Sequence, residues 1–159
     1  MAPAVGQSAP GPVQGRVPAP LAPAAARRLG QRVDSVLALM TLEEKAGQLS
    51  ITGARPGLED RIKAGLLGGT NGVLPGRDVL AVTRHLQQLA MQSRLKIPLL
   101  FMGDVIHGFR TVYPVPLALA ATWDTALVTS VDSASAAEAT ASGVDWTFAP
   151  MLDIGRDPR

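Results

Sequence analysis

Three residues that could do chemistry follow one short apolar segment of this chain. Asp104, His107 and Arg110 come after the run 97–102, and Gly103 separates the run from them. An uninterrupted apolar run of this length favours a strand that is buried on both faces, as in a parallel sheet. Ligands bind at the carboxyl ends of such strands in open α/β sheets and in β/α barrels. We therefore expect these side chains at a ligand-binding edge.

A second group of charged residues lies at the end of the chain. It follows the segment 145–149, whose composition favours a strand and which Pro150 stops. The loop beyond holds four charged side chains, namely Asp153, Arg156, Asp157 and Arg159. Because the carboxyl ends of parallel strands meet at one edge of a sheet, this loop is expected near Asp104 and His107.

The residue types exclude several other kinds of site. The sequence has no cysteine, which removes disulfides, thiolate nucleophiles and cysteine-bound zinc. Besides His107, only His85 is present, and we expect it on the exposed side of a helix, so neither a metal site nor a histidine-based triad is predicted. His107 is interpreted as structural. The glycine-rich stretch 65–76 lacks the residues and spacing of phosphate-binding loops, and no cofactor is expected.

The composition is that of a globular domain. The chain has 159 residues, of which 47% are hydrophobic, enough to bury a sizeable core. The formal net charge is +2, but residues 1–33 hold four arginines and no acid, so the remainder is net negative. This distribution excludes a nucleic-acid surface. No apolar run approaches the roughly 18 residues of a transmembrane helix, so no membrane span is predicted.

The first part of the chain has an unusual composition. Residues 1–26 are rich in Ala, Pro and Gly, and six of the 13 prolines lie before residue 24. We expect a disordered or extended leader here and an ordered domain over 27–159. Prolines interrupt every apolar stretch that could form the core of a secretory signal, so no signal peptide is predicted.

Two short helices are expected before the first strand. Apolar residues at helical spacing lead up to Met40, and Thr41 to Glu44 has the form of a capping box that would begin a second helix ending at Leu49. The segments that follow are a loop over 52–60, a turn of helix over 61–64 and a first strand over 72–74.

Two longer helices are predicted further along. Residues 78–92 form an amphipathic pattern whose buried face includes Val82. Asp124 is a candidate N-cap for a helix over 124–142, and Gly143 is a candidate C-terminal cap.

The alternation of strand-like and helical segments defines the fold class. It predicts an α/β fold with right-handed βαβ units and a parallel sheet. The proline-punctuated segment 113–117 is not expected to form a regular helix. Three strands complete no common α/β fold, so the architecture is expected to be incomplete.

Four segments match one family in their order and spacing. They are MTLEEKAGQL (40–49), SRLKIP (93–98), DVIHGFRTVYP (104–114) and APMLDIGRDPR (149–159). Together they resemble the N-terminal part of glycoside hydrolase family 3, over about residues 30–159. The resemblance implies a (β/α)8 barrel of the TIM type, of which this chain would supply the first three β/α units after the two short helices.

The resemblance also implies an activity and a binding site. It is greater to the glucosidase branch, whose members are retaining hydrolases of terminal β-D-glucosyl residues in β-glucosides and oligosaccharides. By resemblance, Asp104 accepts two sugar hydroxyls, in keeping with the strength of hydrogen bonds to carboxylates. Arg159 would donate to a sugar hydroxyl. The residues expected to brace this site are His107, Arg110, Asp153 and Asp157.

The same resemblance assigns no catalytic residue to this chain. The family's nucleophile, in a Ser-Asp motif, and its acid/base carboxylate lie further along the members, and neither motif occurs here. Glu138 is expected to be solvated or paired with a loop, and Trp123 and Trp146 to be buried at the ends of elements.

Two alternatives stay open from the sequence. One is a free-standing, non-catalytic module that binds a sugar or a partner, and the other is an unrelated small α/β protein. The resemblance implies a periplasmic or secreted enzyme, and the chain would otherwise be cytoplasmic. It leaves the oligomeric state open.

Overall fold

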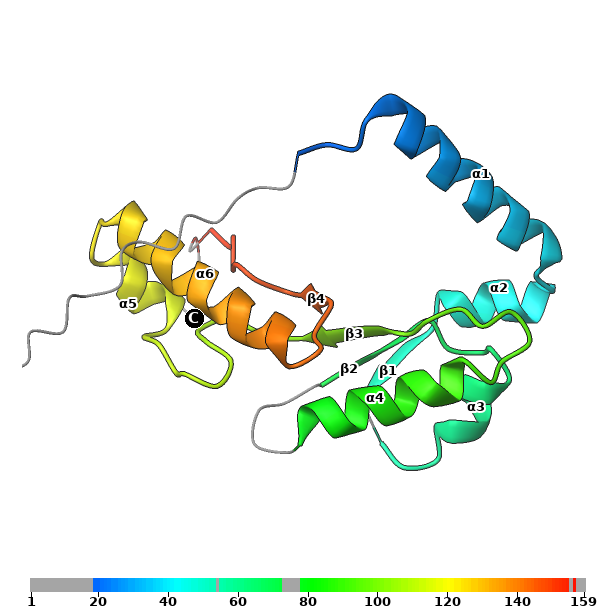
Figure 1. Cartoon of the computed structure of the whole chain (residues 1–159). Helices are drawn as coiled ribbons and strands as arrows, with labels where there is room; N and C mark the ends of the chain where they lie inside the picture. Colours follow the sequence, from blue (N-terminus) through cyan, green and yellow to red (C-terminus); the bar gives the residue numbers. More distant parts are fainter. Residues whose placement is uncertain (1–18, 54, 73–77, 155, 157–159) are drawn as a thin grey trace, which may run out of the picture.

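The computed structural model describes residues 19–53, 55–72, 78–154 and 156, and it has an α/β fold (Figure 1). Its four strands form one parallel sheet in the order β1-β2-β3-β4. The strands are β1 (Ile51–Gly53), β2 (Gly69–Asn71), β3 (Leu100–Gly103) and β4 (Trp146–Thr147). The helices are α1 (Pro23–Leu39), α2 (Leu42–Gln48), α3 (Glu59–Lys63), α4 (Val79–Ala90), α5 (Pro116–Ala120) and α6 (Thr125–Ala141). The predicted α/β class and parallel sheet are confirmed.

The first two strands differ from the prediction. A strand was expected over 72–74. Gly72 is not part of a strand, so the prediction is wrong there, and residues 73–77 lie outside the described residues. The strand β2 ends just before Gly72, and β1 overlaps the expected loop over 52–60, so the described chain has four strands where three were predicted. Neither strand contains an apolar run, and pairing with neighbours decides their conformation. A Cβ on Gly69 would lie 2.6 Å from the Leu100 carbonyl oxygen, so glycine permits this close pairing.

The helices α3, α4 and α6 pack against one face of the sheet. Phe101 of β3 belongs to a buried cluster that includes Ile62 of α3, Leu86 of α4 and Ala139 of α6. Figure 1 shows α3 and α4 lying against the sheet, with α6 beyond them toward β4. Because burial of apolar surface is the main favourable contribution to folding, this cluster holds the helices to the strands.

The opposite face of the sheet is open over part of its area in the described chain, although Met102 on this face is buried, at 1% exposed. The strand register places Ile51, Leu100 and Trp146 on this face, and their exposed fractions are 47%, 45% and 50%. None of the described helices combines the length and the hydropathy that crossing a bilayer requires.

The helix α1 begins earlier than expected. It begins at Pro23, so the prediction that residues 1–26 lack regular structure is wrong for 23–26, and residues 1–18 lie outside the description. Pro at the first helical position has a suitable φ, and the alanines that follow are strong helix formers. No side chain of α1 is buried, and Figure 1 shows the helix standing apart from the sheet.

The predicted helix caps are confirmed. Thr41 and Glu44 form a reciprocal capping box at α2. The carboxylate of Asp124 accepts the amides of Ala126 and Leu127 at α6, each at 3.0 Å. Gly143 follows α6 with a φ of 87°, in the left-handed region that favours glycine.

Two details of the helices correct the predictions. Val82 is 44% exposed and the neighbouring Thr83 is buried, whereas the rest of the predicted face of α4 is buried as expected, at Leu86, Leu89 and Ala90. Thr83 packs against Gly143, and a Cβ added to Gly143 would lie only 2.9 Å from the hydroxyl oxygen of Thr83. The second correction is α5, which begins at Pro116 inside a segment expected to be non-helical. Proline occupies the first turn, where its missing N–H is not needed.

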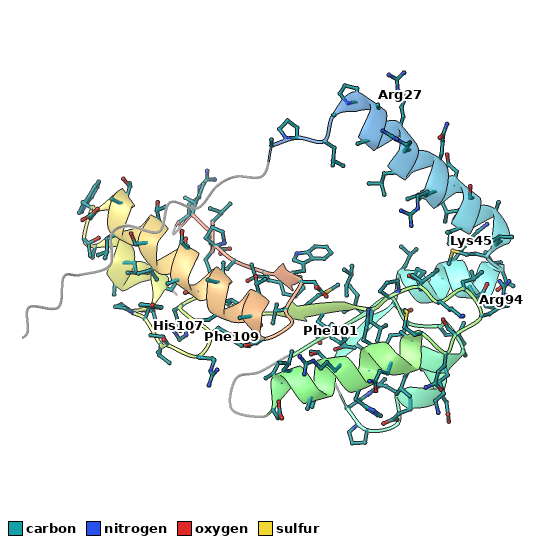
Figure 2. All side chains as sticks on the ribbon, viewed as in Figure 1. Arg27, Lys45, Arg94, Phe101, His107 and Phe109 are labelled. Carbon is teal, nitrogen blue, oxygen red and sulfur yellow. The ribbon has the colours of Figure 1, made fainter. Side chains whose placement is uncertain are left out.

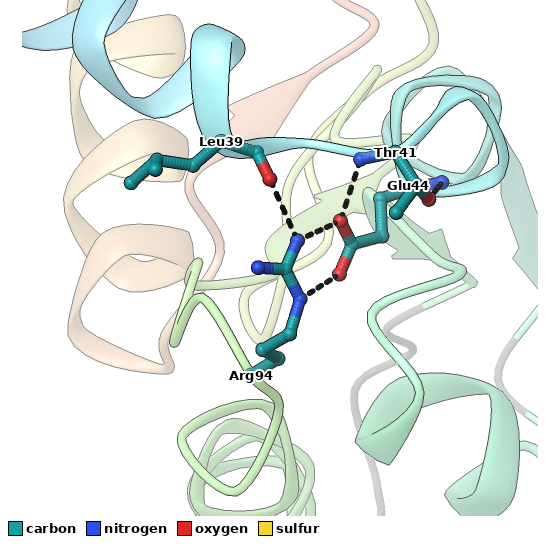
Figure 3. Close-up of polar contacts among 4 residues, drawn as sticks. All are labelled: Leu39, Thr41, Glu44 and Arg94. Atoms are coloured by element: carbon teal, nitrogen blue, oxygen red, sulfur yellow. Dashed lines mark hydrogen bonds and ion pairs between the residues drawn. The ribbon is translucent and has the colours of Figure 1, made fainter.

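A charged pair connects the first two helices to the segment between α4 and β3 (Figure 3). The Glu44 carboxylate accepts the Thr41 amide at 2.9 Å through one oxygen and Arg94 Nε at 3.0 Å through the other. Arg94 Nη2 also donates to the Leu39 carbonyl at 2.8 Å, which satisfies an acceptor at the end of α1. These hydrogen bonds, above all that from Arg94, hold the pKa of Glu44 below its usual range.

We expect Glu44→Gln to destabilise the fold and to flatten its dependence on pH. A lowered carboxyl pKa contributes stability above its unfolded value of about 4.3, and this contribution is lost as the pH falls through the folded value. Urea unfolding followed by circular dichroism between pH 7 and pH 3 should therefore show a steeper decline for the wild type than for the variant.

The exposed neighbour Glu43 provides the matched control, because it carries the same charge in the first turn of α2. Glu43→Gln should keep the steep decline of the wild type. Equal pH profiles for wild type and Glu44→Gln would contradict the proposed coupling.

Candidate functional site

The candidate site lies at the carboxyl ends of β3 and β4. These strands pair in parallel, with Gly103 opposite Thr147, so the segments that follow them leave from the same edge of the sheet. Asp104 is the first residue after β3, is exposed, and its carboxylate makes no hydrogen bond with the described residues. Asp153, in the segment after β4, is also exposed. The Asp104 side chain is therefore accessible at this edge.

Asp104 begins a loop that extends to Val115 and is anchored by apolar side chains. Val105 and Phe109 are each 5% exposed and belong to the buried cluster under the sheet. Figure 2 shows Phe109 and His107 on this loop, beside α6. These anchors hold the backbone against the core, while the side chain of His107 between them stays exposed.

The loop closes on itself as a tight hairpin. The Tyr113 amide donates to the His107 carbonyl at 2.8 Å, and Gly108 forms an antiparallel bridge with Val112. Gly108 has a φ of 109°, and a Cβ there would lie 1.9 Å from the Thr111 carbonyl oxygen. Only glycine fits this position without strain.

The tip of the hairpin is bound to α6 by a carboxylate. One oxygen of Glu138 accepts the amides of Arg110 at 2.9 Å and Thr111 at 2.8 Å, and the other accepts the Thr111 hydroxyl at 2.6 Å. The prediction that Glu138 pairs with a loop is thus confirmed. The hydroxyl and amide of Thr111 lower the pKa of Glu138, with a smaller contribution from Arg110.

The two other predicted residues of this loop have exposed side chains. The carbonyl of His107 closes the hairpin, but its imidazole makes no hydrogen bond within the described part of the chain. The structural contribution of His107 is therefore that of its backbone. The Arg110 amide contacts Glu138, while its guanidinium is exposed.

The expected partner of Asp104 cannot be placed beside it. Asp157 and Arg159 lie outside the described residues, so a shared subsite for Asp104 and Arg159 stays a prediction. The exposed Asp153 has no side-chain hydrogen bond to the described residues, so the bracing role predicted for it rests on the sequence alone.

The tryptophan predictions are wrong. Trp123 is 94% exposed and Trp146 is 50% exposed, whereas both were expected to be buried. Trp123 occupies the turn between α5 and α6, where its backbone has a φ of 53°. Trp146 lies on the open face of the sheet, where its ring centroid is 5.9 Å from that of Phe148.

One polar residue that supports the strands of the site was missed, at the amino end of β4. The Asp145 carboxylate accepts the Phe101 amide at 3.0 Å, and the Asp145 amide donates to the Phe101 carbonyl at 2.8 Å. Asp145 therefore extends the pairing of β3 and β4 by one residue. The only feature of the sequence that could have indicated this role of Asp145 is its position directly before an apolar strand.

The arrangement suits hydrogen bonding to a polar ligand. No cluster of three or more His, Asp or Glu side chains able to hold a metal ion occurs among the described residues. An exposed carboxylate on a rigid strand end can accept two neighbouring hydroxyl groups, and such charge-assisted bonds orient a ligand well.

Comparison with known proteins identifies clear relatives. A family model described as glycosyl hydrolase family 3 N-terminal domain matches residues 41–159. A periplasmic β-glucosidase from Salmonella typhimurium is 40% identical over 133 residues, which cover 80% of this chain and 17% of that protein. Thus, the chain spans about a sixth of the length of this relative.

Solved structures give the same result. A β-glucosidase from Listeria innocua in complex with isofagomine is 37% identical, with a TM-score of 0.65 over 80% of this chain and 19% of that one. An exo-1,3/1,4-β-glucanase from a Pseudoalteromonas species is 27% identical, with a TM-score of 0.70 over 82% of this chain and 18% of that one.

The loop geometry predicts a large effect of Gly108→Ala. The substitution adds both a strained φ and a clash with the Thr111 carbonyl, so we expect a loss of about 2 kcal/mol or more in the free energy of unfolding. Urea unfolding measures it. Gly57→Ala is the control, because Gly57 has a φ of 87° but no neighbour within 4 Å of a Cβ. Gly57→Ala should lower the free energy of unfolding by about 1 kcal/mol. Equal losses for Gly57→Ala and Gly108→Ala would refute the clash with the Thr111 carbonyl.

Proposed function

Because the chain belongs to glycosyl hydrolase family 3, we propose that it supplies the first part of the catalytic barrel of a retaining β-glucosidase. The substrates are terminal β-D-glucosyl residues of β-glucosides or oligosaccharides. Support comes from the Salmonella relative, which is named as a β-glucosidase, and from the Listeria enzyme, which was solved with isofagomine.

The observation that carries this proposal is the position of Asp104. Its carboxylate is exposed directly after a buried central strand, at the sheet edge where barrel enzymes place their ligands. A pyranose presents neighbouring hydroxyl groups, and an ionised carboxylate that accepts two of them fixes the orientation of the ring. In this proposal Arg159 donates to the same sugar, and the residues that brace the subsite are His107, Arg110, Asp153 and Asp157.

The proposal separates sugar binding from bond cleavage. Retaining glycosidases need a nucleophilic carboxylate and an acid/base carboxyl group about 5–5.5 Å apart. The Ser-Asp motif that carries the family's nucleophile does not occur in these 159 residues. We therefore assign a share of the sugar subsite to this chain, and both catalytic groups to other parts of the complete enzyme.

The same proposal covers the barrel. The pairs β1-α3, β2-α4 and β3-α6 would be its first three β/α units, preceded by α1 and α2, and β4 would begin the fourth. The open face of the sheet, with Leu100 and Trp146, would then face the barrel interior.

A periplasmic location is also part of the proposal. It is supported by the Salmonella relative, which is named as a periplasmic enzyme. Release of the protein from cells by osmotic shock would agree with this location, and retention with the cytoplasmic fraction would refute it.

The proposed activity is tested with the complete gene product and, separately, with residues 1–159. The complete protein should hydrolyse an aryl β-glucoside with retention of anomeric configuration, which NMR of the first-formed sugar detects. Residues 1–159 should be no faster than buffer, because they lack both catalytic groups. Turnover by residues 1–159 would refute the assignment of both catalytic groups to other parts of the enzyme. An inactive complete protein would refute the proposed activity.

We expect Asp104→Asn to lower kcat/KM of the complete enzyme severely. The amide carries no charge and can accept fewer hydroxyl groups, so a reduction of roughly 100-fold or more is expected. The exposed Asp60 on α3 supplies the control, and Asp60→Asn should leave kcat/KM unchanged. Similar values for the wild type and Asp104→Asn would exclude Asp104 from the sugar subsite.

A further inference from the structure

The loop that carries Asp104 depends on a carboxylate from a different element. Between β3 and α5 the loop is held to the core by Val105 and Phe109, but its tip consists of polar residues that the core cannot bind. Arg110 and Thr111 form this tip, and both donate their amides to Glu138 of α6. Among the described residues, Glu138 is the polar side chain that joins the tip to the rest of the fold.

The chemistry of this contact favours a carboxylate, because hydrogen bonds to a charged acceptor are stronger. Two successive amides and one hydroxyl donate to Glu138, at 2.9, 2.8 and 2.6 Å, so each of its oxygens acts as an acceptor. A glutamine could keep the two amides on its single oxygen and donate its NH2 group to the Thr111 hydroxyl, but it would lose the charge that strengthens all three hydrogen bonds. An aspartate would be one methylene too short to reach the tip from the same turn of α6.

The helix under this carboxylate is itself well fixed. Val131, Ser135 and Ala139 are its buried residues, and Ala139 lies next to Glu138 in the sequence and belongs to the main core cluster. The Ser142 hydroxyl donates to the Glu138 carbonyl at 2.9 Å near the end of the helix. Glu138 therefore transmits the position of α6 to the loop.

We propose that Glu138 is a positioning residue for the sugar subsite, which it serves by fixing the loop 104–115 rather than by touching the sugar. This inference rests on the proposed function. Its carboxylate is occupied by the loop, so it is not available as an acid or base. Fixing the tip sets the direction in which the hairpin presents His107 and Arg110, and it limits the movement of Asp104 at the start of the loop.

The first test measures the loop directly in the 159-residue chain. Amide hydrogen exchange at Arg110 and Thr111 should become about tenfold faster or more in Glu138→Gln, because the charged acceptor is lost. Thr111→Val removes only the hydroxyl bond and should have a smaller effect. The control is Asp132→Asn on the same helix, because Asp132 makes no side-chain hydrogen bond within the described chain.

The second test measures the consequence for catalysis in the complete enzyme. Glu138→Gln should lower kcat/KM for an aryl β-glucoside about 10- to 100-fold, since small displacements of binding groups have effects of this size. Asp104→Asn should then cost less in the Glu138→Gln background than in the wild type, because Asp104 is already displaced. A purely structural role would give additive effects and a lower unfolding midpoint without this coupling.

The outcomes separate this inference from the proposed function. Faster exchange at the tip together with non-additive losses in kcat/KM would support the positioning role. Unchanged exchange, or faster exchange with wild-type kcat/KM, would overturn it while β-glucosidase activity stands. A complete wild-type protein without glucosidase activity would refute the proposed function and, with it, the sugar-positioning role, whereas the exchange data would still establish the hold of Glu138 on the loop.

Discussion

The structure depends on satisfying the backbone of one buried strand, β3. A buried peptide group without a hydrogen-bond partner is costly, so each amide and carbonyl of this strand must find one. The parallel strands β2 and β4 pair with it on its two sides, from distant parts of the sequence. Side chains complete the pairing, because Gln87 of α4 accepts the Leu99 amide at 3.1 Å and Asp145 accepts the Phe101 amide at 3.0 Å. Polar contacts therefore surround β3, and the apolar cluster fills the space under it.

The candidate site follows from this arrangement. Asp104 leaves a strand that is fixed on both sides, so its starting point is rigid, and the loop after it is held by Val105, Phe109 and Glu138. A rigid carboxylate loses little entropy when it binds a hydroxylated ligand, which favours affinity and orientation. Membership of glycosyl hydrolase family 3 is consistent with a sugar as that ligand, because relatives of this chain are β-glucosidases.

The sequence by itself determined the features that depend on neighbouring residues. The capping box of Thr41 and Glu44, the cap at Asp124 and the α/β class were all predicted, because caps and helical periodicity are local patterns. The position of Asp104 after a buried strand was predicted in the same way, from the apolar run before it.

Only the tertiary structure decided the features that depend on contacts between distant segments. The strands β1 and β2 have little apolar signal of their own and exist because they pair, with Gly69 allowing the approach to Leu100. The partners of Glu138 and Asp145 lie 27 and 44 residues away in the chain, so no local pattern could name them. Pairing across such distances is set by the packing of the whole fold, and therefore a residue's role in holding the site becomes visible only in three dimensions.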